Sequence, residues 1–463
     1  MVKNLKRLWL SAATLLVIVA LPGLFASGAK EGTTSGGASA PVSATGPGGY
    51  PAYTGPPVQL TEWAWTSNEN YSNDLFTKAY PDITIKWTNN GVPYPQLLTA
   101  TAAGSGLPDV IMSEYTYAPQ FMTYGTFQDI NKWVPQDLYL KYYPEVTLKW
   151  TSMNGKIYGT PQDSGAATMV YRKDIFDKYG LTVPKTWAEF EATAKKLHAA
   201  DPSITALSFP ANWVLGPLGL VWQAGGKLFD YSNGKWYIDF TNPTAMKVFN
   251  FWGKMIQEKL VAADNWWNAD WYKELADGKT AMVVSGGWFP EWLQLNCKVP
   301  DGTWRVANVP QWDASKPIDG EMGGSGFYVS SQSKNPEAAA LFVLWLNSAE
   351  ASLVQLHDKS QLPILWSKTF TNVLAPKLAG QQYPYFGGQA ITPVSVAGMS
   401  QVNTAFTAVP IMDYVSSSYN DEMQKFVKGG EDINTFVKNW QDGVVAFMKK
   451  QGFNNLVVGS LPQ

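Results

Sequence analysis

The sequence LADGKTAMVVSGGW, at residues 275–288, is the most informative stretch of this chain for its fold. The residues before it are typical of a helix, and Gly278 can adopt the left-handed conformation that ends one. Residues 280–284 are apolar and partly β-branched, which predicts a short buried strand. The Gly-Gly pair after the strand permits a tight turn, so we expect Trp288 at the C-terminal end of a strand, where α/β proteins usually bind ligands. On composition alone, a core Trp beside a tight turn is an equal alternative.

The segment DGEMGGSGFYVSSQSKNPEAAA, at residues 319–340, supports the ligand-binding interpretation. It contains a helix start, since Asn335 is a favourable N-cap, Pro336 suits the first helical position and Glu337 complements the helix dipole. In order and spacing, the two segments resemble the DGKxAM…GxW and GG…SKNPEAA patterns of the large sugar-binding family of extracellular solute-binding proteins, which serve ABC importers.

The resemblance covers most of the chain after Val58. It includes GKIYGTP at residues 155–161, MVYRKDIF at 169–176 and GGKLFD at 225–230. Arg172 departs from the small polar residue that is common at its position in the family. The resemblance implies a periplasmic-binding-protein-like fold of the α/β class, with two α/β lobes joined by a hinge and the ligand cleft between them.

The order of predicted strands and helices agrees with that fold. Strands predicted near residues 58–65, 83–87 and 108–113 alternate with helices, which indicates a parallel sheet with crossover connections. The chain then returns to its first lobe after the second one. The first lobe is expected at residues 58–164 and 323–355, and the second lobe at residues 165–322 and 356–463.

The N-terminal residues have the composition of a secretory signal. A basic start precedes an apolar run at residues 8–25, and small residues follow it. A membrane anchor is the alternative, because the run approaches the length of a membrane span. Pro22, Gly23 and the small residues after them favour cleavage, and no Cys directly follows the run, which excludes a lipid-anchored start of the usual bacterial lipoprotein type. We therefore expect a cleaved signal peptide at residues 1–28 and a flexible Gly/Ser/Pro-rich tether at residues 29–57. The mature protein is expected to be periplasmic or extracellular.

The composition excludes several classes of site. With one Cys and two His in 463 residues, the chain lacks the ligands of a Cys/His zinc site and of a disulfide framework. Its net charge is −2, so we expect no nucleic-acid partner, and we expect no metal or cofactor. The chain contains 21 Trp, 22 Tyr and 21 Phe. Aromatic rings cover the apolar C–H faces of sugars, so this composition favours a carbohydrate ligand.

The candidate ligand-binding residues follow predicted strands or lie in turns. In the family, the loops after the first and third strands commonly contact the sugar, which implies roles for residues 65–68 and 114–115. For Asn68, a helix N-cap is at least as good an interpretation. Tyr385 lies in a loop rich in aromatic and turn residues, which is a candidate for the cleft rim. The full set is Trp65, Asn68, Glu114, Tyr115, Asp163, Asn212, Trp213, Trp222, Trp288, Gly323, Gly324 and Tyr385.

The first hypothesis for function is the substrate-binding component of an ABC transporter, which captures a sugar or oligosaccharide outside the cytoplasmic membrane and delivers it to the permease. The expected partners are a carbohydrate ligand and the permease subunits, and the protein is expected to be a monomer without catalytic residues. One alternative is a secreted glycoside hydrolase, which needs two carboxylates at a defined separation, such as Glu114 and Asp163. Another alternative is a binding protein for a non-sugar solute.

Overall fold

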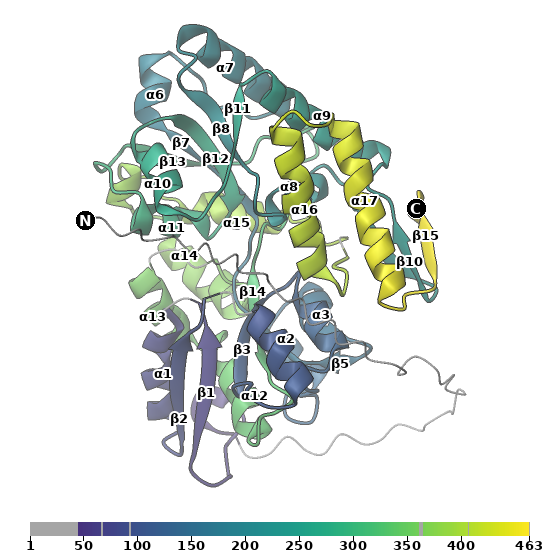
Figure 1. The fold of residues 1–463 in the computed structure, drawn as a ribbon. Helices are drawn as coiled ribbons and strands as arrows, with labels where there is room; N and C mark the ends of the chain where they lie inside the picture. Colours follow the sequence, from purple (N-terminus) through teal and green to yellow (C-terminus); the bar gives the residue numbers. More distant parts are fainter. Residues whose placement is uncertain (1–44, 66–67, 92–93, 361–363, 406, 463) are drawn as a thin grey trace, which may run out of the picture. The chain divides into compact units, whose positions relative to one another are not determined.

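The computed structural model describes residues 45–65, 68–91, 94–360, 364–405 and 407–462 (Figure 1). A first five-stranded sheet has the strand order β2-β1-β3-β14-β6. β1 runs parallel to β2 and β3, whereas β14 runs antiparallel to β3 and β6. The strands are β1 (Val58–Ala64), β2 (Ile83–Asn89), β3 (Val110–Glu114), β6 (Gly159–Pro161) and β14 (Ser325–Val329).

Helices cover the first sheet because its central strands are apolar on both faces. β3 is buried at its first four positions, and every residue of α12 from Ala338 to Leu346 is buried. Pro336 occupies the first position of α12 as predicted, although the Asn335 side chain makes no capping hydrogen bond. The helices of this first lobe are α1 (Asn68–Ala79), α2 (Tyr94–Ala103), α3 (Ala118–Thr123), α4 (Gln136–Tyr142), α5 (Leu148–Thr151), α12 (Pro336–Leu346) and α13 (Glu350–Ser360).

A second five-stranded sheet has the strand order β11-β8-β12-β7-β13. β12 is buried at every position and pairs in parallel with β8 and antiparallel with β7. The strand predicted at residues 280–284 is therefore confirmed and extends to Gly286. Gly278, before it, has the left-handed φ of 74° expected at a helix end. The strands are β7 (Ala167–Arg172), β8 (Thr205–Pro210), β11 (Val261–Asp264), β12 (Thr280–Gly286) and β13 (Trp304–Asn308).

Helices surround the second sheet as well (Figure 1). The helices of this second lobe are α6 (Lys173–Lys178), α7 (Trp187–Ala200), α8 (Leu215–Gln223), α9 (Pro243–Gln257), α10 (Ala269–Ala276), α11 (Phe289–Asn296), α14 (Ala375–Leu378), α15 (Thr392–Ser400), α16 (Met412–Val427) and α17 (Ile433–Lys450). A small sheet consists of β9 (Phe229–Ser232), β10 (Lys235–Ile238) and β15 (Leu456–Val458). A short hairpin in the first lobe consists of β4 (Ser152–Met153) and β5 (Lys156–Ile157).

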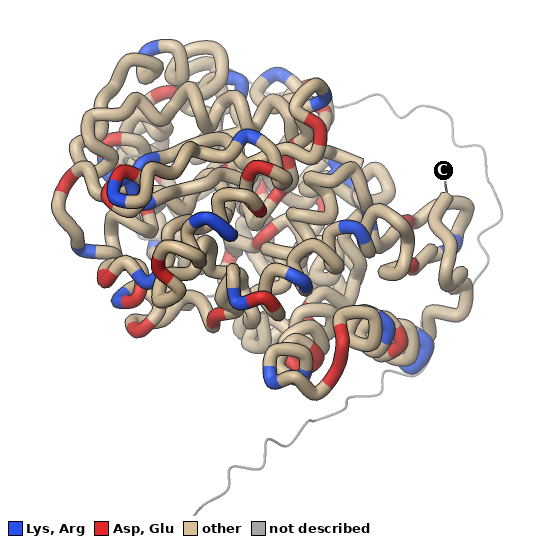
Figure 2. The backbone as a smooth tube through the Cα atoms, turned by 90° about the horizontal axis from the view of Figure 1, so that it is seen from above, with Lys and Arg blue, Asp and Glu red and all other residues tan. Residues whose placement is uncertain are grey.

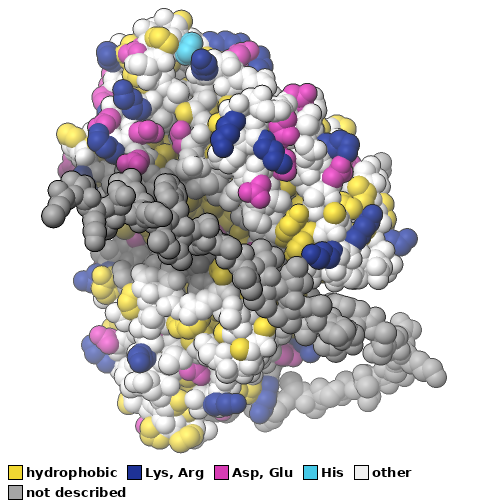
Figure 3. Space-filling model, viewed as in Figure 1, with side chains coloured by type: hydrophobic (Ala, Val, Ile, Leu, Met, Phe, Trp, Pro, Cys, Tyr) yellow, Lys and Arg dark blue, Asp and Glu magenta, His cyan; other side chains and the backbone are white. Residues whose placement is uncertain are grey.

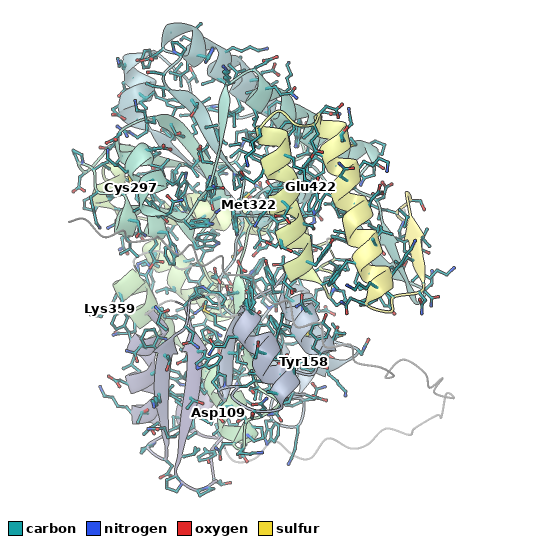
Figure 4. The ribbon with its side chains drawn as sticks, in the orientation of Figure 1. Asp109, Tyr158, Cys297, Met322, Lys359 and Glu422 are labelled. Atoms are coloured by element: carbon teal, nitrogen blue, oxygen red, sulfur yellow. The ribbon has the colours of Figure 1, made fainter. Side chains whose placement is uncertain are left out.

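Two extended segments, residues 164–167 and 319–322, carry the chain between the two sheets. They pair with each other, since the Met322 N–H donates to the Gly165 carbonyl over 2.7 Å and the Ala167 N–H donates to the Gly320 carbonyl over 2.9 Å. Met322 lies at the level where the chain crosses between the lobes (Figure 4). These paired segments are the hinge, and the predicted α/β fold with two lobes is confirmed.

The segment before β1 is ordered, which corrects part of the sequence-based prediction. The Tyr50 ring stacks on Tyr142 at a centroid distance of 4.7 Å, and its hydroxyl forms a 3.0 Å hydrogen bond with the Ser348 hydroxyl. The Tyr80 hydroxyl donates to the Pro51 carbonyl over 3.0 Å. Residues 45–57 are therefore packed on the first lobe and are no flexible tether. The predicted signal peptide and the rest of the predicted tether lie outside the described residues.

α13 sets the point at which the chain leaves the first lobe for the last time. The boundary expected at residue 355 falls inside this helix, which continues to Ser360 and packs against α1. The whole helix therefore groups with the first lobe. In the part of the chain that the structure describes, no single helix is long and apolar enough to cross a membrane, although α12 and α13 meet that criterion as a pair bent by 63°.

Candidate functional site

Trp288 lies where the second lobe meets the hinge. It follows β12 after Gly287, and its indole Nε1 donates a hydrogen bond to the Met322 carbonyl over 3.1 Å. A Cβ on Gly286 would come within 2.4 Å of that nitrogen, and a Cβ on Gly323 would come within 3.0 Å. The two glycines therefore make room for the indole ring, which stays partly exposed.

Three partly exposed Trp rings meet at this place. The ring of Trp213, which follows β8, lies nearly perpendicular to the rings of Trp267 and Trp288, at centroid distances of 5.3 and 5.9 Å and interplanar angles of 88° and 84°. The centroids of Trp267 and Trp288 are 5.6 Å apart. We call these three residues the Trp triad. Together they present a large apolar surface with polar N–H edges.

A buried layer holds the Trp triad in position. Trp266 and Trp271 stack at 4.8 Å, and both donate from Nε1 to the Ser208 hydroxyl, over 2.9 and 3.0 Å. Ser208 in turn donates to the Asp264 carboxylate over 2.5 Å. The Asn212 side chain accepts from the Trp266 N–H over 2.8 Å and donates to the Trp266 carbonyl over 3.2 Å. Asn212, a predicted ligand residue, therefore fixes the loop that carries Trp267.

Trp267 is absent from the sequence-based set of ligand residues. Its φ is 71°, in the left-handed region that a bulky residue seldom adopts. The loop is held by the next residue, because Asn268 caps α10 by accepting from the Trp271 N–H over 2.9 Å. Strained backbone of this kind gathers at functional sites. The sequence feature that could have pointed to Trp267 is the Trp pair at residues 266–267, directly before the strong N-cap residue Asn268.

The first lobe contributes two carboxyl groups at the hinge. The Tyr94 hydroxyl donates to Glu114 Oε2 over 2.9 Å, and the Glu114 N–H donates to that hydroxyl over 3.0 Å. Burial raises the pKa of Glu114 to about 7, and the nearby Asp163 adds to the rise. Asp163 Oδ1 accepts from the Ser325 N–H over 2.8 Å, and Ser325 pairs with Glu114 across β14 and β3. Glu114 and Asp163 therefore flank Ser325.

The segment from Met322 to Ser325 brings the two halves of the site together. Met322 accepts from Trp288 of the second lobe, whereas Ser325 donates to Asp163 of the first lobe. The Trp triad and the two carboxyl groups thus lie around one short stretch at the hinge. Among the residues with described positions, no group of three His, Cys, Asp or Glu side chains is placed to hold a metal ion.

Gly323 and Gly324, two of the predicted ligand residues, lie where packing leaves little room for a side chain. Their φ values are 95° and 78°. A Cβ on Gly324 would lie 2.4 Å from Glu321 Oε1 and 2.8 Å from the Tyr115 ring. Tyr115 is 1% exposed, and its hydroxyl donates to the Asp163 carbonyl over 2.9 Å. The Tyr115 side chain therefore holds Asp163 in place from inside the core.

Of the four other predicted ligand residues, two lie in buried cores. Trp222 is 3% exposed because it belongs to α8, where every residue is buried. Tyr385 is 7% exposed, and its hydroxyl donates to the Cys297 carbonyl over 2.7 Å, so its loop packs into a core of the second lobe and not at a cleft rim. Trp65 is half-buried against the core of the first lobe. Asn68 begins α1, and its side chain lies outside the described part of the chain.

Asp319 and Glu321, which the sequence-based set omits, fasten the hinge. Glu321 Oε1 accepts from the Gly165 N–H over 2.6 Å, and Asp319 Oδ1 accepts from the Ala167 N–H over 2.9 Å. Each carboxyl group thus reaches from one crossing segment to the other. Both side chains are buried, and burial raises the pKa of each well above its usual value.

The structure has two lobes, paired segments that cross between them, and a candidate site at the hinge. These features define the class of hinged, two-lobed binding proteins. The chain belongs to the family of bacterial extracellular solute-binding proteins, whose model matches residues 36–352. It is 24% identical over 296 residues to the arabinooligosaccharide-binding protein of Halalkalibacterium halodurans, a match that covers 60% of this chain and 65% of that protein. It is 24% identical over 359 residues to the lactose-binding protein of Rhizobium radiobacter, covering 72% and 80% of the two chains.

Solved structures with the same fold agree with this assignment. The ABC transporter associated binding protein from B. animalis subsp. lactis, solved in complex with β-1,6-galactobiose, matches with a TM-score of 0.77 and 27% identity over 86% of this chain and 99% of that one. The galacto-N-biose-/lacto-N-biose I-binding protein of Bifidobacterium longum has the same fold, with a TM-score of 0.74 and 22% identity over 86% and 99% of the chains.

Proposed function

We propose that this protein is the substrate-binding component of an ABC transporter, and that it captures a sugar or oligosaccharide outside the cytoplasmic membrane and delivers it to the permease. The observation that carries the proposal is that Trp288 of the Trp triad and Asp163 both hydrogen-bond to the segment from Met322 to Ser325, and Glu114 pairs with Ser325. The triad covers the apolar C–H face of a sugar ring, and the carboxyl groups accept hydrogen bonds from its hydroxyls. The lobes close on the ligand by bending at the paired crossing segments.

The named ligands of the relatives support a short oligosaccharide. The solved protein from B. animalis subsp. lactis holds β-1,6-galactobiose, and two relatives are named for arabinooligosaccharides and lactose. These compounds combine apolar ring faces with hydroxyl donors, which are the two features that the Trp triad and the carboxyl groups match. A disaccharide or short oligosaccharide is therefore the ligand class that we propose.

In this proposal the protein is exported, with residues 1–28 removed as a signal peptide and no Cys placed for lipid attachment. It works as a monomer that docks on the permease subunits. It has no catalytic activity of its own, so Glu114 and Asp163 bind the sugar and do not cleave it. The family match and the N-terminal composition described above support export and a binding role.

Calorimetric titration with β-1,6-galactobiose, lactose and arabinobiose tests the proposal. We expect at least one of them to bind, and Trp213→Ala to weaken that binding by roughly tenfold or more, as loss of a central aromatic contact does. Trp133→Ala is the matched control, because Trp133 is a half-buried Trp packed on the core of the first lobe. Folded protein that binds none of the sugars would contradict the proposal. Cleavage products detected by chromatography would favour the hydrolase instead.

A further inference from the structure

The candidate site continues past Glu114 on the side away from Trp288. The Tyr94 hydroxyl donates to Glu114, and the Tyr94 ring stacks on Tyr117 at a centroid distance of 4.1 Å. Both rings are buried, and Tyr117 directly precedes α3. In Figure 1, α11, which begins directly after Trp288, lies on the opposite side of β14 from α3. The stacked pair and the Trp triad therefore lie at opposite ends of the site.

At the end with the stacked pair, the second lobe contacts the first lobe through the start of α16. The Asp413 backbone N–H donates to the Gln120 side chain of α3 over 3.3 Å, and the Asp413 carboxyl group also hydrogen-bonds with that side chain. The Tyr117 side chain hydrogen-bonds with Ser416, which lies further along α16. These contacts join the two lobes beside the stacked pair. We call Tyr94, Tyr117, Gln120, Asp413 and Ser416 the end wall.

The end wall is packed like a protein core. Met412 and Val415 of α16 belong to the same buried hydrophobic cluster as Tyr94 and Tyr117, so the cluster spans both lobes here. A further contact between the lobes comes from α5, where the Lys149 ammonium group donates to a carbonyl of the second lobe over 2.8 Å. Protein interiors are close-packed. In this arrangement the end wall therefore leaves no room for a further sugar unit beyond it.

The opposite end of the site is more open. The three rings of the Trp triad are partly exposed, whereas Tyr94, Tyr117 and Gln120 of the end wall are buried. Lys and Arg are interspersed with Asp and Glu along the backbone and over the visible surface, so no single sign of charge dominates the outside of the molecule (Figures 2 and 3). The difference between the two ends of the site is therefore one of shape.

Two polar atoms at the end wall have no hydrogen-bond partner among the described residues. One is Oγ1 of Thr116, which directly precedes Tyr117 and is 1% exposed, and the other is Oδ1 of Asp413. Buried polar atoms are normally paired. Both atoms therefore suit the hydroxyls of a sugar unit that reaches the end wall.

We propose that the site binds the end of a saccharide: the terminal unit of a disaccharide or short oligosaccharide stops against the end wall, and the rest of the chain runs past Glu114 toward the Trp triad. This proposal rests on the proposed function, since it narrows the ligand class of the same site. One end of the ligand must then be unsubstituted, because a group added there would have to displace packed side chains. A group added at the other end extends toward the partly exposed rings.

The test adds the same small group to either end of one ligand. The full chain is titrated calorimetrically with β-1,6-galactobiose, lactose and arabinobiose. Each disaccharide that binds is then titrated as two propyl derivatives, one substituted at the anomeric oxygen and the other at the primary hydroxyl oxygen of the non-reducing unit. We expect one derivative to bind roughly tenfold or more weakly than the parent, and the other to bind within about threefold of it.

Two variants connect this difference to the end wall. Tyr117→Ala removes one ring of the wall, and Gln120→Ala removes the acceptor of the Asp413 N–H. In each variant the ratio between the affinities for the parent and for the disfavoured derivative should fall by about threefold or more, because space is opened at the wall. Tyr80→Ala is the matched control, because Tyr80 is a buried Tyr that packs on Phe76 in the other core of the first lobe. Its ratio should stay at the wild-type value, and unfolding midpoints confirm that all three variants are folded.

The outcomes separate this proposal from the proposed function. Two derivatives that both bind wild-type protein like the parent, or that are both rejected, overturn the site with one enclosed end and leave sugar binding intact. An unchanged ratio in folded Tyr117→Ala and also in folded Gln120→Ala overturns the role of the end wall, and so does an equal fall of the ratio in Tyr80→Ala. If no saccharide in the series binds to folded protein, the proposed function fails, and the selection of a chain end fails with it.

Discussion

The indole nitrogen of Trp288 and the backbone carbonyl of Met322 are joined by a hydrogen bond of 3.1 Å, which links the end of β12 to the segment that crosses between the lobes. The position of the ring therefore depends on the hinge as well as on the strand. Because the same indole contacts Trp213 and Trp267, a movement of the crossing segment reaches the whole Trp triad. We expect closure of the lobes and the shape of the binding surface to be coupled for this reason.

Replacing Trp288 tests its place in the site. Trp288→Ala should weaken sugar affinity by roughly tenfold or more, while its effect on the free energy of unfolding should be smaller than that of a core truncation. Trp440 is 0% exposed, so Trp440→Ala provides the comparison, with an expected loss of about 3–5 kcal/mol through the cavity it leaves. Calorimetry measures affinity, and urea unfolding measures stability. A loss of stability as large as that of Trp440→Ala, with normal affinity, would assign Trp288 to the core.

Two substitutions at Trp267 distinguish the effect of its strained backbone from the effect of losing its ring contacts. Trp267→Ala and Trp267→Gly both remove the ring, so both should weaken sugar affinity by a similar factor. Gly adopts a φ of 71° without strain, so Trp267→Gly should be more stable than Trp267→Ala by ~1 kcal/mol. Thermal unfolding without sugar measures this difference. Equal stabilities would mean that the loop relaxes once the ring is gone.

Because the segment before β1 packs on the first lobe, we expect changes in this segment to lower stability and to leave sugar binding unchanged. Tyr50→Phe loses the hydrogen bond to Ser348 and should lower the free energy of unfolding by about 1 kcal/mol. Tyr50→Ala also loses the ring stacked on Tyr142 and should lower it by ~3 kcal/mol or more. A chain that begins at Pro56 should lose as much stability as Tyr50→Ala and bind sugar as tightly as the longer chain.

Urea unfolding and calorimetry of these variants check the prediction. Tyr53→Ala is the matched control, because the Tyr53 hydroxyl makes its hydrogen bond at the surface, with the Pro56 carbonyl at 2.8 Å. This variant should lose much less stability than Tyr50→Ala. An unchanged unfolding midpoint in the shortened chain would show that Tyr50 contributes nothing to the first lobe.

The pKa of Glu114, raised from 4.5 to about 7, predicts how stability changes with pH. A carboxyl group with a higher pKa in the folded state binds more protons there, so the free energy of unfolding falls as the pH rises from 4.5 to about 7. The full difference corresponds to about 3 kcal/mol. Glu114→Gln does not titrate and should flatten the profile across this window. If Glu114→Gln keeps the wild-type slope, the pH dependence of the free energy of unfolding comes from other groups.

Local patterns in the sequence predicted local structure. The helix end at Gly278, the buried strand after it and the helix start at Pro336 depend on neighbouring residues, and all three are confirmed. Burial depends on which elements pack together, and the sequence does not give that packing. Trp222 and Tyr385 were therefore included in the predicted set with Trp288, although they lie in cores.

Two further features depend on partners or backbone angles that sequence patterns do not reveal. The Gly- and Pro-rich surroundings of Tyr50 indicate disorder, whereas its ring is ordered by Tyr142, far along the chain. Trp267 joins the Trp triad through a φ of 71°, and no residue pattern predicts that angle for a Trp. The sequence-based set therefore includes Trp213 and Trp288, and the structure was needed to add Trp267 as the third member of the triad.

The indole rings near the hinge are close enough for their electronic transitions to couple. Neighbouring centroids among Trp213, Trp266, Trp267, Trp271 and Trp288 are 4.8 to 5.9 Å apart. At such spacings the transition dipoles of adjacent chromophores couple, and absorbed light is shared among them before it is emitted. The near-ultraviolet circular dichroism of this protein should therefore report the relative orientation of its rings, which gives the molecule a built-in spectroscopic label at the point where its lobes meet.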